Sequence, residues 1–473
     1  MSADTNGGAV GWDLAILGAG SAAFAAAITA RDAGARVVMI EQTTVGGTCV
    51  NVGCVPSKAL IAAADTYHRG RTHGFAGIAR LGGARPDLAA IVARKDQLVA
   101  EMRQTKYLDL AADYGFELRR GTGRFVDEAT LSVDGEPLTA GSYLIATGAH
   151  PAVPPIDGLA AVDYLTSTSA LDVVELPRRL AVIGASAIGL ELGQAFAHLG
   201  SEVTFLDVAG RIAPFEEPEI SAALTDVLTG DGARVVTGAR TERVSPVAGG
   251  MVLHGELGGL GSTLEVDRVL VATGRAPNTA DLGLDAAGVD VDDRGFVIVN
   301  GQLRATNARV WAAGDVTASP QFVYVAAAEG ALAAANALGG AQAATERAVP
   351  RVTFTTPPVA AVGATEAEAV AAGFDVTTAV LPLAHVPRAT VNGDTRGLIK
   401  LVADRSTGRL IGVHVLGDGA GDVIQAGVYA LMAGMTTAAM AEAYHPYLTM
   451  AEGLKLAAQA FSRDVTRLSC CAA

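Results

Sequence analysis

Residues 14–23 read LAILGAGSAA, an apolar run that leads into a Gly-rich turn. An Ala-rich stretch follows the turn, and a second apolar run, VVMIE, covers residues 37–41. This order predicts a strand, a tight turn, a helix and a second strand. Gly18 and Gly20 would let phosphates approach the amino end of the helix, and Glu41 would accept hydrogen bonds from ribose hydroxyls. A Gly-x-Gly turn alone also suits a structural turn, but the complete unit favours dinucleotide binding.

The same unit recurs in the middle of the chain. The run LAVI at 180–183 leads into the turn GASAIG at 184–189, and VTFLD at 203–207 predicts the second strand. Two such units predict a doubly wound α/β protein that binds two dinucleotides. Asp207 would accept the ribose hydroxyls of NADH, whereas Arg211 would reach the 2′-phosphate of NADPH or lie in solvent as a surface charge. The sequence leaves the choice between the two nucleotides open.

The composition limits the possible functions. Of the 473 residues, 50% are hydrophobic and 56 are Gly, which excludes a disordered chain. The formal net charge of -14 argues against nucleic acid and anionic membranes as partners. Residues 1–11 lack the basic start of a secretory signal, so we expect a cytoplasmic protein. The uncharged stretches 14–30 and 423–441 approach the length of membrane spans, but a Gly turn interrupts the first and polar residues interrupt the second.

The four cysteines form two close pairs, Cys49 with Cys54 and Cys470 with Cys471. So few cysteines in a chain of this length do not make a disulfide scaffold, and the pairing indicates redox or metal chemistry in a reducing compartment. The first pair lies in GGTCVNVGCVPSK at 46–58. On a helical stretch the two sulfurs would lie about one turn apart, close enough for a disulfide or for one soft metal ion. Two buried structural cysteines are the alternative interpretation.

The segment 46–58 and the two dinucleotide units resemble the pyridine nucleotide-disulfide oxidoreductase family, and the resemblance covers essentially the whole chain. It implies a flavoenzyme that uses FAD and NAD(P)H and forms a homodimer. It also implies an α/β fold with two Rossmann-like dinucleotide-binding domains and a C-terminal α+β dimerisation domain. The FAD domain would be discontinuous, at 1–150 and 275–345, with the NAD(P) domain at 151–274 and the dimerisation domain at 346–473.

Three short segments add cofactor residues by the same resemblance. ATGA at 146–149 and ATGR at 272–275 would mark the crossings between the nucleotide-binding domains. The Gly-Asp pair that ends VWAAGD at 310–315 would contact the ribityl-phosphate of FAD. The residues expected at FAD are Gly18, Gly20, Ser21, Ala22, Glu41, Gly47, Thr48, Lys58, Thr147, Gly148, Gly274, Arg275, Gly314 and Asp315. The residues expected at NAD(P)H are Gly184, Ser186, Gly189 and Asp207.

The resemblance also assigns roles within the redox segment. Cys54 would form the thiolate that lies against the flavin, and Cys49 would exchange with the substrate. Lys58 would lie near flavin N5 and pair with Glu191 of the NAD(P) domain. An ordinary surface ion pair, which contributes little free energy, is the alternative for these two residues.

Residues 468–473 read LSCCAA, and this stretch resembles the tail of the mercury(II)-reducing branch of the family. Adjacent cysteines form only a strained disulfide, but their thiolates offer two soft ligands to a large polarisable ion. By this resemblance Cys470 and Cys471 of one subunit would take Hg(II) from small thiols. They would pass it to Cys49 and Cys54 of the other subunit, where it is reduced to Hg(0). An accidental terminal pair is the alternative.

Two tyrosines support the same resemblance. Tyr107 and Tyr447 fall where the mercury(II)-reducing branch carries tyrosines at the metal site, and a phenol there would orient or transiently bind the ion. Simple packing is the alternative for both, and it has more weight for Tyr107. This branch mostly uses NADPH, which conflicts with the acid at Asp207.

A disulfide reductase similar to dihydrolipoyl dehydrogenase is the main alternative. Such enzymes use a His-Pro pair and a Glu five residues after the His as a general base. His445 and Pro446 are present, but Met450 takes the place of the acid and Glu452 comes two residues later. This departure and the terminal cysteines argue against a dithiol substrate. The sequence leaves the role of His445 open, with a packed interface residue as the alternative interpretation. A flavoprotein that only sequesters metal or senses redox state is a second alternative, which the intact dinucleotide motifs do not favour.

Overall fold

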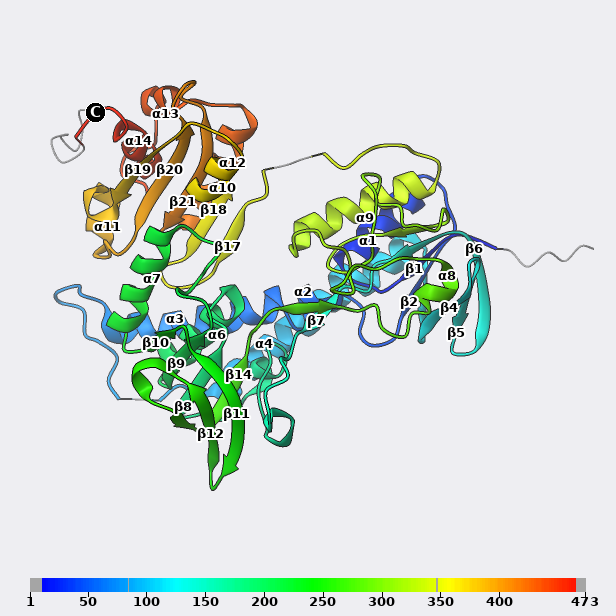
Figure 1. The fold of residues 1–473 in the computed structure, drawn as a ribbon, viewed down its shortest axis with the longest axis horizontal. Coiled ribbons are helices and arrows are strands. Elements are labelled where there is room, and N and C mark those ends of the chain that lie inside the picture. The colour runs from blue at the N-terminus through cyan, green and yellow to red at the C-terminus, as the bar shows by residue number, and fades with distance from the viewer. Residues whose placement is uncertain (1–10, 84, 346–347, 465–473) are drawn as a thin grey trace, which may run out of the picture. The chain divides into compact units, whose positions relative to one another are not determined.

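The computed structural model describes residues 11–83, 85–345 and 348–464, and the chain divides into two compact units (Figure 1). Unit 1 comprises Met1–Ser57, Ala93–Ala152 and Gly274–Glu346. Unit 2 comprises Lys58–Val92, Val153–Thr273 and Arg347–Ala473. Each unit is therefore assembled from separate parts of the sequence. The division into three domains stays a prediction.

Unit 1 is built on a largely parallel sheet. Its strands are β1 (Trp12–Leu17), β2 (Val37–Glu41), β3 (Glu117–Arg120), β4 (Gly123–Asp127), β5 (Thr130–Val133), β6 (Glu136–Ile145) and β16 (Val310–Ala312). They follow the order β3-β2-β1-β6-β5-β4, and β16 also pairs with β6. β1 pairs in parallel with β2 and β6, and its last four residues are buried, as in a strand covered on both faces. The two strands expected within 14–17 and 37–41 are confirmed.

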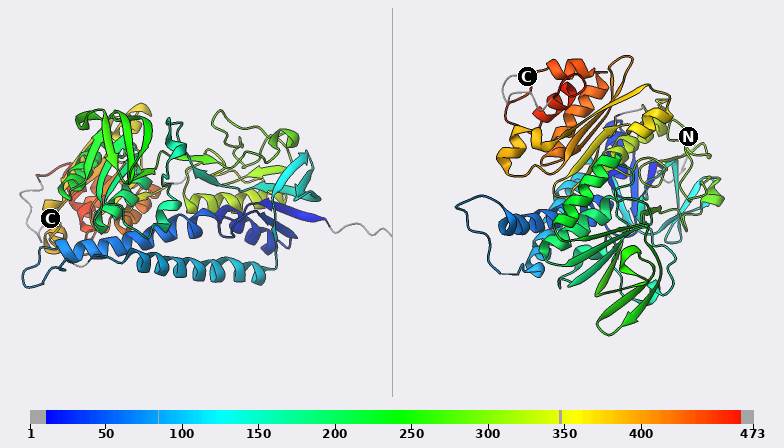
Figure 2. Two further views of the ribbon diagram at one scale, coloured as in Figure 1. Left: turned by 90° about the horizontal axis from the view of Figure 1, so that it is seen from below. Right: turned by 60° about the vertical axis from the view of Figure 1, so that its left-hand side comes forward.

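Small side chains let two helices of unit 1 pack closely. α1 (Ser21–Asp32) and α9 (Val323–Ala337) lie side by side (Figures 1 and 2). Ala22, Ala26 and Ala30 of α1 are buried in the same core cluster as Ala333 and Ala334 of α9. This packing fixes the position of α1, and the amino end of α1 follows the Gly-rich turn directly. The further helices of unit 1 are α2 (Gly47–Asn51), α5 (Asp109–Tyr114) and α8 (Leu284–Ala287). By sequence, α3 (Cys54–Thr72) and α4 (Leu88–Arg103) each belong partly to unit 1 and partly to unit 2.

The two ATG segments lead into strands that pair with each other. β7 (Ala149–Pro151) follows the first segment, and β15 (Arg275–Pro277) follows the second. The two strands are antiparallel neighbours. The Thr147 hydroxyl also donates a hydrogen bond of 2.7 Å to the Asn278 carbonyl. Segments far apart in the sequence therefore meet within unit 1.

Unit 2 contains a second parallel sheet. Its strands are β8 (Arg179–Ile183), β9 (Glu202–Asp207), β10 (Arg234–Thr237) and β14 (Arg268–Val271), in the order β10-β9-β8-β14. α6 (Ala187–Leu199) follows β8, and α7 (Pro218–Gly230) follows β9. Between β10 and β14 the chain forms an antiparallel sheet of β11 (Arg240–Val247), β12 (Gly250–Glu256) and β13 (Thr263–Val266). The strands predicted at 180–183 and 203–207 are confirmed and pair in parallel, as a dinucleotide-binding unit requires.

The later part of unit 2 is an antiparallel sheet with helices. Its strands are β17 (Arg351–Thr353), β18 (Val359–Gly363), β19 (Val376–Pro382), β20 (Leu398–Asp404) and β21 (Leu410–Leu416), in the order β17-β18-β21-β20-β19. Its helices are α10 (Glu366–Ala371), α11 (Pro387–Asn392), α12 (Ala420–Met432), α13 (Thr437–Glu442) and α14 (Glu452–Gln459). Ile424 of α12 and Val413 of β21 belong to one buried cluster, so the helix packs on the sheet.

Neither uncharged stretch of the sequence forms a single helix. Residues 14–30 contain a strand, a turn and most of α1, and 423–441 are divided between α12 and α13. Within the described part of the chain, Gly47–Thr72 is long and apolar enough to cross a membrane, by length and composition only. This stretch carries the redox segment. Leu60 and Ile61 of α3 are buried in a core cluster of unit 2, and core helices of folded domains pass the same test.

Candidate active site

The Gly-rich turn after β1 leaves bare backbone at the amino end of α1. Gly18 has a φ of +102°, and a Cβ atom there would collide with the Ala146 carbonyl. Gly47 approaches the same turn, since a Cβ atom on Gly47 would lie 2.6 Å from the Cα atom of Gly20. The redox segment therefore begins directly against the turn. Because glycine has no side chain, a pyrophosphate can approach the backbone of this turn and the amino end of α1.

Glu41 ends β2 and is held by backbone donors. Its Oε2 atom accepts a hydrogen bond of 2.9 Å from the Ala19 N–H group. Its Oε1 atom accepts hydrogen bonds of 2.8 Å from the N–H group and the hydroxyl of Thr43. Because a carboxylate oxygen has further lone pairs, Glu41 can still accept ribose hydroxyls beside the turn.

The turn after β8 repeats this arrangement. A Cβ atom on Gly184 would collide with the Ala272 carbonyl. Asp207, at the end of β9, accepts hydrogen bonds from the N–H groups of Ala185 at 2.6 Å and Ala209 at 2.8 Å. Both turns place a glycine against a backbone carbonyl and an acidic residue at the end of the next strand. This shared geometry fits the binding of two dinucleotides. The other two residues predicted for the nicotinamide nucleotide lie at the start of α6, Ser186 just before it and Gly189 in its first turn.

A partly buried ion pair, Arg275 with Asp315, follows the second ATG segment. Arg275 Nε lies 3.6 Å from Asp315 Oδ2, and another Arg275 nitrogen donates to the Ala149 carbonyl. Burial lowers the pKa of Arg275 and raises the pKa of Asp315, and each charge opposes the shift of the other. Among the described residues, Arg275 Nε is buried without a hydrogen-bond partner. A buried donor of this kind, beside the bare turn of the same unit, fits a polar cofactor such as FAD.

Gly314, predicted at FAD, has a partner that the sequence did not indicate. Its N–H group donates a hydrogen bond of 2.8 Å to Glu329 Oε2 on α9. Burial raises the pKa of Glu329, although hydrogen bonds from Ser319 and Gly314 oppose the rise. The other residues predicted at FAD in unit 1 are Ser21 and Ala22 at the start of α1, Thr48 in α2, Thr147 and Gly148 before β7, and Gly274 before β15.

The redox segment is divided between two helices. Cys49 lies in α2 and is half-buried, whereas Cys54 begins α3 and is exposed. The expectation of one continuous helical stretch is wrong, because the helix is interrupted at Val52 and Gly53. The interruption places Cys54 at the amino end of a new helix of 19 residues. The helix dipole there favours a thiolate over a thiol.

Lys58 lies on α3 one turn after Cys54, within unit 2, and pairs with Glu191 of α6. The Lys58 Nζ atom is 2.6 Å from Glu191 Oε2, and the Glu191 side chain is only 8% exposed. The other carboxylate oxygen accepts a hydrogen bond of 2.9 Å from the Phe354 N–H group, and Lys58 lies 4.6 Å above the centre of the Phe354 ring. Because the Glu191 carboxylate is buried, Lys58 and Glu191 do not form an ordinary surface ion pair, which was the alternative interpretation. Phe354 had no signal in the sequence, since its role depends on its place after β17.

Tyr107 lies with the cysteine pair in unit 1. It belongs to a π-helical turn, Gln104–Leu108, and such turns often occur at functional sites. Its ring packs edge-on against Phe24 with 4.8 Å between the ring centres. Burial raises the pKa of Tyr107, and so does negative charge on Cys49 and Cys54, while a hydrogen bond with Ser21 opposes the rise. The phenol therefore stays protonated and can donate to a metal-bound or ionised sulfur.

Tyr447 and His445 follow α13 in unit 2. Tyr447 is 55% exposed. The His445 ring nitrogen Nδ1 lies 3.2 Å from the Ala443 carbonyl. Burial raises the pKa of Glu452, and the charges of Lys455 and His445 oppose the rise. A carboxyl therefore lies near His445, although it comes two residues later than in the disulfide-reductase spacing. Cys470 and Cys471 lie outside the described residues.

A second contact joins α3 to α6. The His198 ring nitrogen Nδ1 lies 2.9 Å from Asp65 Oδ1, and Nε2 lies 4.0 Å from Asp231 Oδ2. The ring stacks on His68 with 3.8 Å between the ring centres. Burial lowers the pKa of His198, but the carboxylates of Asp231 and Asp65 outweigh burial and raise it above its ordinary value of 6.5. The imidazolium form is thus stabilised by folding.

This shift predicts a pH dependence of stability. Because the folded pKa of His198 exceeds the unfolded value, its stabilisation is complete below pH 6.5 and is lost as the pH rises through the folded pKa. We expect the melting temperature of the His198→Gln variant to fall less steeply above pH 6.5 than that of the wild type. Thermal unfolding followed by circular dichroism measures both, with His254→Gln on β12 as the control. Equal slopes in wild type and His198→Gln would refute the assignment.

Residues 12–330 match the family described as pyridine nucleotide-disulphide oxidoreductase, and residues 349–458 match the dimerisation domain of that family. The chain belongs to this family. Pyridine nucleotide-disulphide oxidoreductases of this kind use FAD and NAD(P)H, as predicted, and the two turns fit both nucleotides. The match to the dimerisation domain supports a homodimer.

Curated relatives in the family cover almost the whole chain. Mercuric reductase from Streptomyces lividans is 51% identical over 471 residues, which is 98% of each chain. Mercuric reductase from Staphylococcus aureus is 50% identical over 98% of this chain and 84% of its own length. The predicted resemblance to the mercury(II)-reducing branch is confirmed. The chain is an NAD(P)H-dependent flavoprotein oxidoreductase by family.

Solved structures agree on the fold. The Cu(II) complex of the HOCl-induced flavoprotein disulfide reductase RclA from Escherichia coli gives a TM-score of 0.86 at 30% identity, over 95% of this chain and 99% of that chain. LpdA from Mycobacterium tuberculosis gives a TM-score of 0.83 at 27% identity, over 96% of this chain and 100% of that chain. The predicted α/β fold class is confirmed.

Proposed function

We propose that this protein reduces Hg(II) to Hg(0) with electrons from NAD(P)H, as an enzyme of mercury detoxification. One observation carries the proposal. Cys49, Cys54 and the protonated phenol of Tyr107 lie together, and Gly47 of the same segment abuts the bare Gly20 turn. When bound, FAD would relay two electrons from the nicotinamide to the metal held by the cysteines. The relatives named mercuric reductase, at 50% and 51% identity, support the choice of metal.

The cysteines act as ligands in this proposal. A pair of soft thiolates binds Hg(II) more strongly than oxygen or nitrogen ligands do. Cys49 and Cys54 would displace the two thiolates that accompany the incoming ion, so each new Hg–S bond replaces one that breaks. Two electrons then release Hg(0) and leave both cysteine sulfurs as thiolates. The amino end of α3 stabilises the charge of Cys54 before and after this step.

Neighbouring groups position the reaction. Tyr107, kept protonated, would donate a hydrogen bond toward sulfur while the ligands exchange. Lys58 is fixed by the buried Glu191 and would hold a positive charge one turn from Cys54. Both are positioning residues in this proposal.

We further propose a hand-off between subunits. In the homodimer, Cys470 and Cys471 of one subunit would take Hg(II) from small thiols and pass it to the redox pair of the other. The exposed Tyr447 would contact the ion during transfer. We expect this chemistry in the cytoplasm, where thiols remain reduced.

Mercury-dependent oxidation of the reductant tests the function. The FAD-loaded protein is given NADH or NADPH and HgCl2 in excess thiol, and evolved Hg(0) is trapped from the gas phase. Oxidation that depends on mercury and releases vapour is the expected result. Inhibition by mercury together with turnover of lipoamide would instead show a dithiol reductase, the alternative kept open by the carboxyl near His445.

The hand-off predicts a thiol-dependent defect. The double variant Cys470→Ala with Cys471→Ala should turn over about tenfold or more slowly than wild type in excess thiol, because the redox pair must then compete alone for the ion. With mercury salts free of thiol, its rate should stay near that of the wild type. The exposed Ser462→Ala on the same C-terminal segment is the control. An unchanged rate of the double variant in excess thiol would refute the hand-off.

A further inference from the structure

Asp207 occupies the position that distinguishes the two nicotinamide nucleotides. NADH and NADPH differ only in the 2′-phosphate on the adenosine ribose, and a ribose bound beside the turn after β8 would meet the carboxyl end of β9. The Asp207 carboxylate is fixed there by the N–H groups of Ala185 and Ala209, at 2.6 and 2.8 Å. Its Oδ2 atom binds the turn itself. The remaining lone pairs can accept two ribose hydroxyls but not a phosphate.

The three residues directly after Asp207 carry no positive charge. Val208 is 75% exposed and apolar, and it is followed by Ala209 and Gly210. Between Asp207 and Pro214, Arg211 is the single basic residue. Its Nη2 atom donates a hydrogen bond of 2.7 Å to the Pro214 carbonyl. One of the guanidinium nitrogens therefore already donates to the backbone of its own loop.

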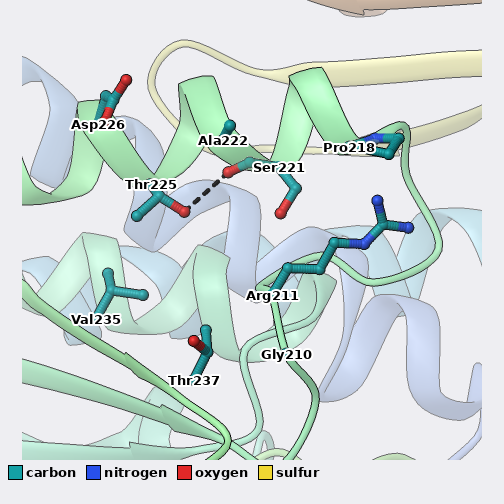
Figure 3. A pocket seen from close by; sticks show the side chains of 9 residues that line it. All are labelled: Gly210, Arg211, Pro218, Ser221, Ala222, Thr225, Asp226, Val235 and Thr237. Carbon is teal, nitrogen blue, oxygen red and sulfur yellow. Dashed lines mark hydrogen bonds between the residues drawn. The ribbon is translucent and has the colours of Figure 1, made fainter.

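The surroundings of Arg211 do not complete a phosphate site. Arg211 lines an open cavity of about 340 Å³ between its loop, α7 and β10, and Figure 3 shows its guanidinium group beside Pro218 at the start of α7. The Ser221 hydroxyl donates to the Ile212 carbonyl at 2.6 Å, and the Thr225 hydroxyl donates to the Ser221 carbonyl at 2.8 Å. The same cavity is lined by Asp226, which would repel an anion.

We propose that this protein takes its electrons from NADH and rejects NADPH, and that Asp207 and Val208 set this preference. The inference rests on the function proposed above and names its reductant. A 2′-phosphate would bring negative charge against the fixed carboxylate and would also remove one hydroxyl donor. Either effect alone weakens binding by about tenfold in a partly exposed site.

Nucleotide fragments test the preference without any reaction. Isothermal titration calorimetry of the FAD-loaded protein is carried out with ADP-ribose and with 2′-phospho-ADP-ribose, neither of which can donate a hydride. We expect ADP-ribose to bind at least about tenfold more tightly. Val208→Arg should strengthen binding of the phosphorylated fragment about tenfold, and adding Asp207→Asn should reverse the preference. Val174→Arg is the matched control, since it adds the same charge at a 52% exposed position before the amino end of β8 and should leave the ratio unchanged.

The outcomes separate this inference from the proposed function. If 2′-phospho-ADP-ribose binds wild type as tightly as ADP-ribose, or if neither fragment binds, the preference is refuted whether or not mercury is reduced. If the fragments behave as expected but neither NADH nor NADPH supports mercury-dependent oxidation, the preference stands and the proposed function fails. If Asp207→Asn does not fold, Val208→Arg alone still tests the nucleotide preference. Val208 is exposed, and its side chain makes no hydrogen bond that the turn needs.

Discussion

The Cys54→Ala variant is expected to lose mercury-dependent turnover by about a thousandfold or more. The remaining thiolate would hold Hg(II) through a single sulfur, and the group stabilised at the amino end of α3 would be gone. The experiment measures NAD(P)H oxidation and trapped Hg(0) at matched FAD content, which absorbance reports. Retained FAD with lost turnover would separate the chemical role of Cys54 from a folding defect.

The control for this variant lies on the same helix. Thr66 is exposed on α3, and its hydroxyl only donates to the Ala62 carbonyl, so Thr66→Ala should turn over like the wild type. Cys49→Ala should be impaired as severely as Cys54→Ala, because the proposal needs both sulfurs as ligands. Turnover by Cys54→Ala within a few fold of wild type would remove the pair from the mechanism.

The Lys400→Met variant is expected to destabilise unit 2 by about 3–5 kcal/mol. Lys400 is 1% exposed and pairs with Glu217 at 3.0 Å, Glu219 at 2.9 Å and Glu366 at 2.7 Å. Burial opposes the charge, but these carboxylates outweigh burial and raise the pKa of Lys400 above its ordinary value. Removing the ammonium would leave Glu217, itself 1% exposed, as a buried carboxylate without its main partner.

Urea unfolding followed by circular dichroism measures the loss, and a double variant supplies the control. Because the cost comes from the carboxylate left behind, Lys400→Met combined with Glu217→Met should recover most of the lost stability. The N–H group of Glu366, which donates to Glu217 at 2.6 Å, would still lose its acceptor, so full recovery is not expected. Strictly additive losses in the double variant would contradict this account of the network.

The sequence by itself determined the two nucleotide-binding turns. Strand, turn, helix and acidic residue all fall within residues 14–41, and again within 180–207, so that local periodicity and glycine spacing specify the unit. The close spacing of Cys49 and Cys54 indicated redox or metal chemistry, and the resemblance of residues 46–58 to the family implied the redox role. Patterns of this kind are readable because the residues that form them are neighbours in the chain.

Local patterns could not show which partners these residues acquire. Glu191 accepts from the N–H group of Phe354, 163 residues away, and Gly314 donates to Glu329 across the junction of β16 and α9. The interruption of the helix after Cys49 was also missed. Such features depend on how separate elements pack against each other. The spacing of residues along one element does not predict that packing.

The tertiary structure also decided the charge states. The sequence named Tyr107 with packing as its alternative, but only the folded chain half-buries Tyr107 beside the cysteines and so raises its pKa. The sequence likewise left Arg211 open as a phosphate ligand, and the structure directs part of its guanidinium to the Pro214 carbonyl. The sequence thus determined which chemical groups are present and where the turns lie. Packing decided what each group contacts, because burial and neighbouring charges exist only after the chain has folded.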